Sequence, residues 1–443
     1  MSSGTLRENR GQLLHILGVS FGIAVAIGGM IGVGILRTPS LIAAQVPSMS
    51  LIIVLWVIGA AQSALEANVI SELATTFPRA GGFYVYAHRA FGDIGGLMVG
   101  WTSWISRLAS SAALAVAFAD FTALIWPFAA HHLSIVSVSM LIAVFGFNMV
   151  GLREGRSLQQ LTSLAKALAL AAFCVIAFMV ATPPQTFAAA ALPQVGALGL
   201  LGAYQMIVGA YAGWYEPASF SEENAQPGRS LPRAMFLGLG LAAVLYLGVN
   251  AALLHALGPN GLAKATLPYS TILVHVAGNA TGVLFAVGAL VVVASCANAG
   301  IMAAPRILLA LSRDQLLPAI FRNVNTGGSP YAAFAITGAC AIVLALSGSF
   351  VLLFGLIATL QSASFVLTIA SIFVLRRREP EATRPYRAIG YPLLPALILI
   401  IDTVLTIVFL SLNWVGGLYA AIMWLACIPF AMIARRARNA GPR

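Results

Sequence analysis

Charged residues are scarce in this chain of 443 residues. Asp, Glu, Lys and Arg make up only 8% of it, whereas hydrophobic residues make up 60% and the mean hydropathy is +0.93. A soluble domain carries about 25% charged residues. The composition therefore excludes an ordinary soluble protein and predicts an all-α protein that crosses a membrane several times.

Cysteine is also scarce, and no Cys-x-x-Cys pair occurs. All four cysteines lie in apolar runs: Cys174, Cys296, Cys340 and Cys427. We interpret them as small buried side chains, not as a disulfide or metal set. The spans contain no nucleophile–base set and no metal-ligand cluster, so we predict no enzyme, no metal site and no cofactor.

Apolar runs long enough to cross a bilayer recur along the whole chain. We predict about twelve spans, at residues 15–45, 48–76, 92–126, 132–150, 157–182, 197–224, 232–257, 281–311, 331–348, 350–375, 391–413 and 415–434. The one long connection, 258–280, has room for short surface helices. Residues 1–443 therefore form a single transmembrane domain.

The net charge of +11 has an uneven distribution along the chain. With the N-terminus inside, most arginines fall on the cytoplasmic side of the predicted spans, and only Arg37 and Lys264 fall near the outside. This positive-inside bias predicts an integral protein of the cytoplasmic membrane with both termini cytoplasmic. It argues against a nucleic-acid partner.

Several ionisable residues lie inside predicted spans, where they are costly and usually face a cavity or a partner. Four lie well within the apolar runs: Glu66, Arg107, Lys166 and Glu216. Three others lie close enough to a span end to be solvated: Asp120, Arg306 and Asp402.

Two spans contain helix-breaking residues near their centres. The first has four glycines between Gly28 and Gly34, and the sixth has Gly209, Gly213 and Pro217. Pro217 would remove a hydrogen bond inside a helix and crowd the carbonyl of Gly213. Paired breaks five spans apart indicate a transporter built from inverted repeats. Helix packing on small residues and a simple proline kink are the alternative explanations.

Five motifs together resemble the amino acid–polyamine–organocation (APC) superfamily, especially bacterial relatives of the L-type amino acid transporters. They are GGMIGVGILRTP from Gly28, SELATTFPRAGGFYVYAHRAFG at 71–92, AYAGWYEPASFSEENAQPGRSLPRAM at 210–235, NAGIMAAPRILLALSRDQLLP at 298–318 and RRREPEATRPYRAIGYPLLPAL at 376–397. The resemblance covers nearly the whole chain, with the motifs in the family's order.

The resemblance implies a LeuT-like five-plus-five inverted-repeat core with broken helices 1 and 6. Repeat one would span about 15–182, repeat two about 197–375, and two extra helices about 391–434. It further implies a sodium-independent secondary transporter of amino acids in a bacterial inner membrane, working by alternating access with exchange or proton coupling. The expected partners are an amino acid and the lipid bilayer, with no obligatory protein partner.

The resemblance also assigns a substrate site to the backbone at the two breaks. The substrate carboxylate would bind N–H groups at a half-helix start, where the dipole is positive. The ammonium would bind carbonyls that the breaks set free. The donors are Gly32, Val33 and Gly34, and the acceptors are Met30, Gly209 and Ala212.

Other family positions differ from this chain or carry several interpretations. Val33 replaces a usual serine. Gly209 replaces a gating phenylalanine, which either widens the pocket or leaves outer closure to Tyr211 or Trp214. Lys166 matches a lysine whose ammonium takes the place of a sodium ion and would bridge the first and eighth helices. Asn298 would tie helices together or, alternatively, contact substrate.

Four acidic residues leave alternatives open. Glu216 could meet a cationic substrate, carry a proton, or pair structurally with Arg107. Together with Glu66 it supports an alternative function, the transport of cationic amino acids or polyamines. A non-transporting membrane sensor is a further alternative. Glu222 and Glu223, with Arg229 and Arg233, would form an inner gate or a solvated rim.

Overall fold

The structure is a computed structural model, and it describes residues 13–412 apart from 124, 180–195, 266, 279–280 and 347–349, with scattered positions between 418 and 432. Within these residues the chain is helical, and its only β pairing is an isolated bridge between Leu17 and Asn224. Most of the predicted span 415–434, including Cys427, lies outside the described residues, as do both chain ends.

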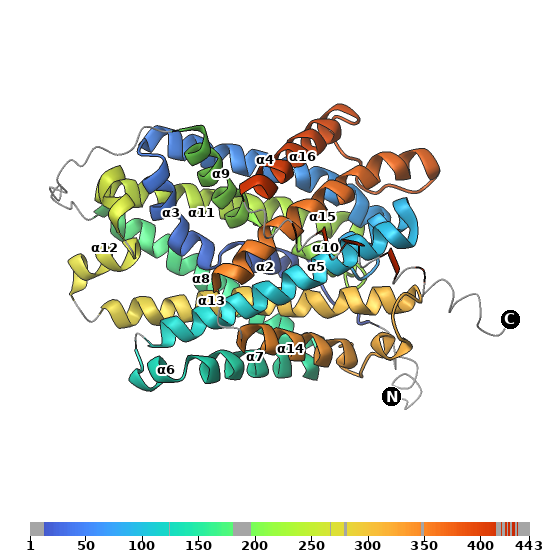
Figure 1. The fold of residues 1–443 in the computed structure, drawn as a ribbon, viewed down its shortest axis with the longest axis horizontal. Helices are drawn as coiled ribbons and strands as arrows, with labels where there is room; N and C mark the ends of the chain where they lie inside the picture. Colours follow the sequence, from blue (N-terminus) through green and yellow to red (C-terminus); the bar gives the residue numbers. More distant parts are fainter. Residues whose placement is uncertain are drawn as a thin grey trace.

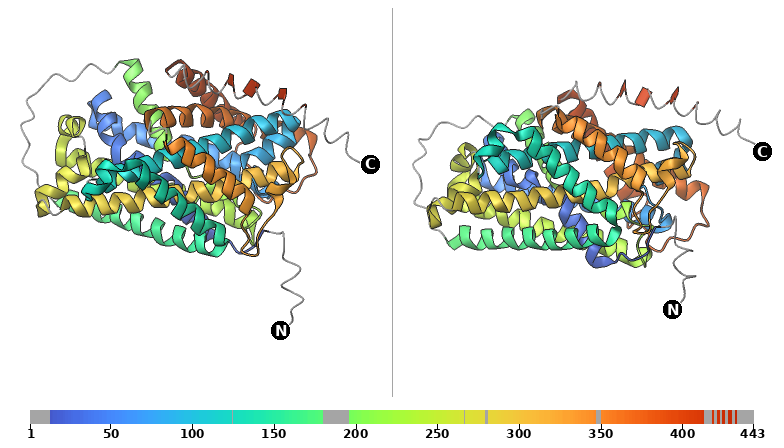
Figure 2. Two further views of the ribbon diagram at one scale, coloured as in Figure 1. Left: turned by 60° about the horizontal axis from the view of Figure 1, so that its bottom comes forward. Right: turned by 90° about the horizontal axis from the view of Figure 1, so that it is seen from below.

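The helices run roughly side by side along the long axis of the molecule (Figures 1 and 2). They are α2 (Val19–Met30), α3 (Val33–Gln45), α4 (Met49–Thr76), α5 (Phe83–Ala123), α6 (Pro127–His131), α7 (Leu133–Val150), α8 (Leu152–Met179), α9 (Ala197–Tyr211), α10 (Glu216–Ser219), α11 (Pro227–Lys264), α12 (Pro268–Ala277), α13 (Thr281–Arg313), η1 (Ala319–Arg322), α14 (Tyr331–Leu346), α15 (Phe350–Arg378) and α16 (Leu393–Leu412).

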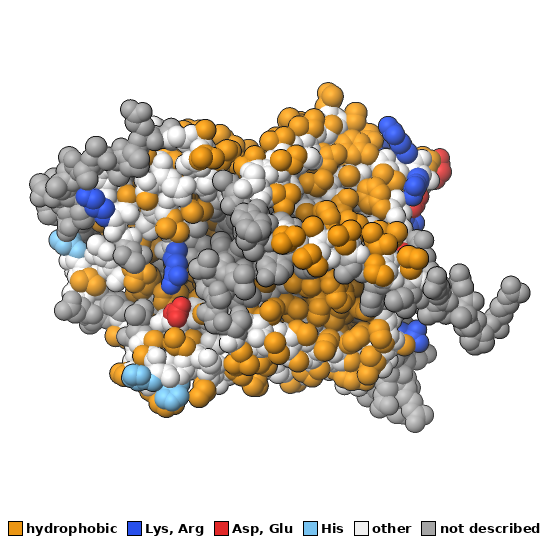
Figure 3. All heavy atoms as spheres, viewed as in Figure 1, with side chains coloured by type: hydrophobic (Ala, Val, Ile, Leu, Met, Phe, Trp, Pro, Cys, Tyr) orange, Lys and Arg blue, Asp and Glu red, His pale blue; other side chains and the backbone are white. Residues whose placement is uncertain are grey.

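These helices account for the first eleven predicted spans. Eight described helices are long and apolar enough to cross a membrane, and α2 and α3 form a ninth span that bends by 43° at its break. The shorter apolar helices α9 and α14 occupy the predicted spans 197–224 and 331–348. In Figure 3 apolar side chains spread over much of the right half and the lower edge of the visible face, and the charged side chains gather mainly at its right end. The prediction of an all-α polytopic membrane protein is confirmed.

Small residues allow the long helices to pack closely. The helix α5 packs along both α13 and α15, and its buried side carries Gly96, Gly100, Ala112 and Ala115. In lipid, close packing of this kind supplies much of the attraction between helices. Further along the chain, Gly258 with a φ of 66° bends α11. The helix α12 follows, so the connection 258–280 contains helical structure, as predicted.

The expected role of Pro217 is wrong. The helix α9 ends at Tyr211, and the short helix α10 begins at Glu216, so Pro217 lies in a first turn rather than inside a helix. A first-turn residue has no intrahelical partner for its N–H, and proline therefore loses nothing there. The chain turns instead at Gly213, whose φ is +124°, a region that disfavours every other residue.

Candidate functional site

The two helix breaks touch each other through their backbones in the middle of the bundle, where α2 and α10 lie (Figure 1). A Cβ atom placed on Gly213 would lie 2.4 Å from the carbonyl carbon of Gly29. A Cβ atom on Gly29 would lie 2.9 Å from Cα of Gly213. Only glycine at both positions permits this approach. The two glycines therefore serve close packing, the alternative in sequence analysis, at the helix breaks themselves.

The second half of the first span begins with an uncapped helix end. Gly32 is extended, with φ of −132° and ψ of −159°, and α3 starts at Val33 without a side-chain cap. The first N–H groups of a helix have no intrahelical acceptor. Gly32 faces α13, because its Cβ would lie 2.8 Å from Sγ of Cys296. Gly34 faces α9, where a Cβ would meet Cα of Ala210 at 3.6 Å.

A tyrosine that sequence analysis missed holds the carbonyls at both breaks. The hydroxyl of Tyr246 in α11 lies 2.6 Å from the Met30 carbonyl oxygen and 3.0 Å from that of Ala210. One hydroxyl hydrogen can serve only one of them at a time. Nothing in the local sequence marks Tyr246, since a single tyrosine in an apolar run is common.

The sixth-span acceptors are differently placed. The Gly209 carbonyl accepts the Ala212 N–H at 3.3 Å, so it closes the end of α9. Gly209 itself is exposed, and a Cβ added there would meet nothing within 4 Å. The position expected to carry a large gating side chain in relatives is therefore open space in this chain.

Lys166 lies against the break of the first span. It is 1% exposed, and Nζ donates to the carbonyls of Gly28 and Ile31, each at 2.7 Å. Because the helix is broken here, these carbonyl oxygens have no N–H donor within the helix. The link from this break to α13 is made by Cys296, whose thiol donates to Gly29 at 3.5 Å, rather than by Lys166 as expected.

Asn298 lies at the centre of a buried polar network between helices. Its amide donates to Oε1 of Gln159 at 2.8 Å and accepts from Asn148 at 2.7 Å. Ser163, one turn before Lys166, donates to the Ala24 carbonyl at 2.6 Å. Asn298 thus ties α13 to α7 and α8, as one of its two predicted roles required.

The aromatic residues proposed for outer closure are both buried. The Tyr211 hydroxyl donates to the Trp56 carbonyl at 3.1 Å, and its ring packs edge-on against Trp56 at 5.6 Å. Trp214 packs against Tyr215 and Phe365, with ring centroids 5.4 and 5.9 Å away. The two side chains fill separate aromatic clusters on the two sides of the sixth-span break.

Glu216 forms a close ion pair with Arg107 of α5. Both carboxylate oxygens lie 2.6 Å from Nη1, and Nη2 contacts Ser219 at 3.3 Å. The side chains are only 7% and 13% exposed. The contact is the structural pairing that sequence analysis named for Glu216, and it fixes α10 against α5.

Glu66 belongs to a second buried acidic group. Nε2 of Gln62 donates to Glu66 at 2.9 Å and to Asp402 of α16 at 3.0 Å, and Tyr204 of α9 donates to the Gln62 carbonyl. Asp402 is 5% exposed, so the expectation that it is solvated is wrong. Its helix α16 packs against α4, which encloses the carboxyl.

The acidic pair after α10 binds α13 rather than the basic residues that follow it in sequence. Glu223 pairs with Arg306 at 2.8 Å, both almost fully buried, and Glu222 pairs with Arg313 at 2.7 Å. The expected partners Arg229 and Arg233 are wrong, because α13 passes directly beside this segment. Arg306 is therefore also not solvated, whereas Asp120 is exposed as expected.

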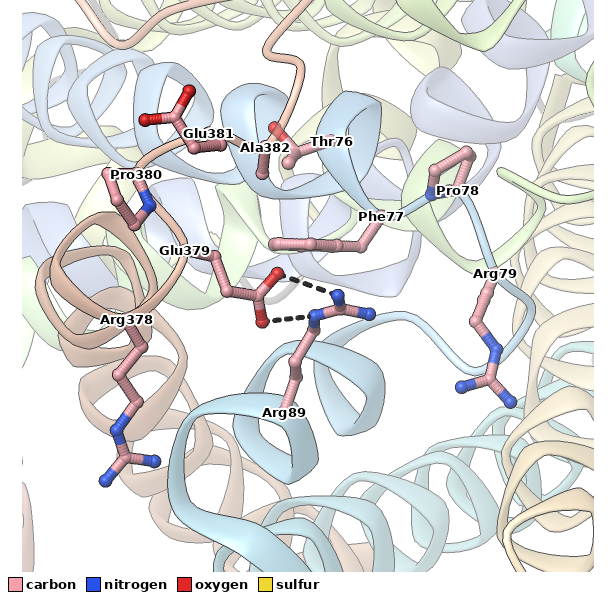
Figure 4. Close-up of a pocket in the computed structure, with 10 residues that line it drawn as sticks. All are labelled: Thr76, Phe77, Pro78, Arg79, Arg89, Arg378, Glu379, Pro380, Glu381 and Ala382. Atoms are coloured by element: carbon pink, nitrogen blue, oxygen red, sulfur yellow. Dashed lines mark hydrogen bonds and ion pairs between the residues drawn. The ribbon is translucent and has the colours of Figure 1, made fainter.

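A pocket of about 600 Å³ opens at the charged end of the molecule (Figure 4). Arg89 of α5 crosses it and donates two bonds, 2.6 and 2.7 Å long, to Glu379 just after α15. Its guanidinium also lies 4.4 Å from the ring centroid of Phe77. Hydrogen bonding to Arg89 lowers the pKa of the Glu379 carboxyl. The pair connects α5 to α15 at the surface.

The described residues contain no group of three or more His, Cys, Asp or Glu side chains that could hold a metal ion. Cys174, Cys296 and Cys340 are free and partly buried.

Comparison with known proteins identifies the protein family to which the chain belongs. A family model described as amino acid permease matches residues 17–433. The chain is 26% identical over 389 residues to the serine/threonine exchanger SteT of Bacillus subtilis, covering 86% of this chain and 88% of that protein.

Two further relatives agree. An uncharacterized transporter of Mycobacterium tuberculosis is 30% identical over 349 residues, with 76% and 75% coverage. The mouse Asc-type amino acid transporter 1 is 24% identical over 396 residues, with 86% and 74% coverage. These matches confirm the resemblance to the APC superfamily and indicate an amino acid transporter rather than an enzyme.

Proposed function

Since the chain belongs to the amino acid permease family, we propose that it is a secondary transporter that carries amino acids by alternating access, without sodium. The contact between the two helix breaks carries this proposal. It brings the start of α3 and the end of α9 together on buried backbone, where irregular structure in a membrane is tolerated only against protein or a cavity. Coupling is by exchange or by protons.

The substrate carboxylate binds the N–H groups of Gly32, Val33 and Gly34 at the start of α3. A helix start offers both free donors and the positive end of the dipole. Val33 contributes only its N–H, because its side chain has no hydroxyl. This arrangement recognises any α-amino acid and leaves selectivity to the side-chain pocket.

The ammonium binds carbonyls at the breaks, and the Met30 carbonyl is the principal acceptor. Its oxygen has a second lone pair beside the Tyr246 hydroxyl, which lies 2.6 Å away. Ala212 and Gly209 supply further acceptors once the end of α9 loosens. Tyr246 therefore holds the acceptor in place and yields to the substrate.

Lys166 replaces a coupling sodium ion. Its ammonium binds two carbonyl oxygens of the first break at 2.7 Å each. These oxygens are therefore occupied and do not coordinate a sodium ion. A buried positive charge at the break also complements the negative end of α2.

The substrates are neutral amino acids, with serine and threonine the first candidates because the relative SteT is named an exchanger of both. The alternative of cationic amino acids or polyamines is less well supported. Glu216 is already neutralised by Arg107, so it offers no free charge to a cationic substrate. Glu66 lies beside Asp402 on the shared amide of Gln62, between α4 and α16.

The proposal further places both termini in the cytoplasm of a bacterial inner membrane. It assigns residues about 15–182 and about 197–375 to inverted repeats, with two additional helices at about 391–434. The broken first span opens one repeat and the broken sixth span opens the other, which is the pairing that inverted-repeat transporters display.

Uptake of labelled serine into proteoliposomes tests the proposal. Uptake that requires unlabelled serine inside indicates exchange, whereas uptake driven by a pH gradient alone indicates proton symport. Replacing sodium by choline should change neither the exchange nor the uptake driven by the pH gradient. The variant Gly34→Leu fills the space beside Ala210 and should abolish uptake. If the protein transports none of the twenty amino acids, the proposal is wrong.

A further inference from the structure

The contacts of Glu66 and Asp402 leave their charge unbalanced. Both carboxyls are buried between α4 and α16, and each accepts one N–H of the same amide, that of Gln62. The shared amide nitrogen therefore brings one oxygen of Glu66 and one oxygen of Asp402 close together. Two carboxylates this close repel each other, and a proton on one of them removes the repulsion.

The neighbouring helices supply no positive charge to this pair. Tyr204 of α9 and Trp214 and Tyr215 at the sixth-span break approach Glu66, and Arg107 beside α10 is already bound to Glu216. The charged residues of α15 lie in its last turn, and those of α11 lie near its ends. Among the described residues, no Lys, Arg or His forms an ion pair with Glu66 or Asp402.

One acceptor in the pair remains open. Oδ2 of Asp402 is buried and has no hydrogen-bond partner among the described residues, although Oδ1 accepts from Gln62. A buried carboxylate oxygen without a partner is costly in a membrane, where water is absent. Protonation removes the charge and turns this oxygen pair into a donor and an acceptor.

We propose that Glu66 and Asp402 share one proton and are the site at which transport is coupled to protons. The inference rests on the proposed transport function and chooses protons over pure exchange. Two neighbouring acidic groups titrate as a pair, so the apparent pKa of each proton-binding step belongs to the pair and not to one residue. The pair belongs to α4 and α16, whereas the proposed carboxylate donors belong to the start of α3, so proton and substrate are held by different groups.

Tyr204 connects this proton to the moving part of the site. Its hydroxyl donates to the Gln62 carbonyl, and the same amide donates to both carboxyls. Tyr204 lies on α9, two turns before the helix ends at Tyr211 and the sixth-span break begins. Loss of the proton makes the two carboxylates repel each other, which disturbs Gln62 and releases α9. Tyr204 is thus a positioning residue that transmits the protonation state.

Infrared spectroscopy of the purified full chain in lipid nanodiscs tests the proton directly. At neutral pH the wild type should give a protonated-carboxyl band that Glu66→Gln and Asp402→Asn each remove. Asp120→Asn, which alters an exposed carboxyl, should retain the band. Absence of the band in the wild type, or its persistence in both variants, would overturn the proposal. A band that appears only after sodium is replaced by choline would assign the pair to sodium and overturn it as well.

Proteoliposome uptake tests the coupling. One coupled proton under an inward gradient of one pH unit drives about a tenfold accumulation of labelled serine. Glu66→Gln and Asp402→Asn should lose this accumulation but keep serine–serine exchange, which also proves that they are folded. Tyr204→Phe should keep the infrared band and weaken the pH response. Unchanged accumulation in both carboxyl variants would overturn the coupling role.

The two proposals fail in distinguishable ways. If the wild type shows exchange but no response to pH, the inference fails and the transport function stands. If the wild type moves no amino acid, the transport function fails, and the infrared band alone decides whether the pair holds a proton.

Discussion

The substitution Lys166→Met removes the ammonium beside the first-span break while keeping a flexible side chain of similar length. Two hydrogen bonds of 2.7 Å disappear, to the carbonyls of Gly28 and Ile31. Each hydrogen bond to a charged group contributes about 1.5–3 kcal/mol, so the two contribute about 3–6 kcal/mol. Removing a buried charge recovers several kcal/mol of desolvation cost. We therefore expect Lys166→Met to reduce the free energy that favours the intact break over opened forms by about 2 kcal/mol.

A loss of this size has a measurable effect on transport. It lowers the population of the intact break relative to opened forms by a factor of about 30. The apparent Kd is the intrinsic Kd divided by the fraction of protein with an intact break. KM for serine should therefore rise, by up to the same factor, while uptake at saturation changes less. The measurement is the concentration dependence of serine uptake into proteoliposomes.

The chain provides a matched control in its other lysine, Lys264, which is exposed in the last turn of α11. Lys264→Met should leave KM unchanged. Melting of both variants in detergent separates a local effect on the break from global unfolding. An unaltered KM in folded Lys166→Met would refute the argument that this ammonium holds the break.

Three further predictions concern other contacts. Gly213→Ala places a Cβ 2.4 Å from Gly29 at a strained φ, so folded yield on size exclusion should drop, whereas Gly240→Ala, with nothing within 4 Å, should not lower it. Glu216→Gln leaves the Arg107 guanidinium buried without a counter-charge, so the free energy of unfolding should fall by about 3–5 kcal/mol, measured by thermal melting. The double variant Arg107→Met/Glu216→Met removes both charges and should recover stability. An unchanged pH profile of uptake in Glu216→Gln would exclude a proton or substrate role. Arg89 lowers the pKa of Glu379 below its ordinary 4.5, so the pair stabilises the fold above pH 4.5 and loses this contribution as the pH falls through the lowered pKa. Arg89→Gln should therefore be less stable than wild type at pH 7, by no more than about 1 kcal/mol, and equally stable in strong acid. Thermal melting at the two pH values measures the difference.

The sequence was informative where backbone chemistry alone decides the structure. Gly28 to Gly34 and Gly209 to Gly213 weaken helices whatever their neighbours are, and both breaks lie where the pattern predicts them. Pro217 illustrates the limit of this reasoning. Its effect depends on whether a helix already runs through it, and the turn at Gly213 means that none does.

The partners of buried polar groups were harder to predict because they come from distant parts of the chain. Arg107 was foreseeable for Glu216, since both are unmatched charges inside spans. Asp402 was not foreseeable for Glu66, because 336 positions separate them and both are acidic. Tyr246 carried no sequence signal at all, since its role depends on which carbonyls the folded breaks expose.

The buried ionic contacts specify what must change when the site opens. Lys166 binds the first-span break to α8, Arg107 binds α10 to α5, and Arg306 binds the segment after α10 to α13. Each of these charges would be costly to expose to lipid without its partner. Movement of either broken helix therefore requires these groups to move together or to exchange partners. The Glu66–Asp402 pair differs from these ion pairs, because binding a proton reduces its negative charge where it lies. Its charge can therefore change during a transport cycle without separating helices.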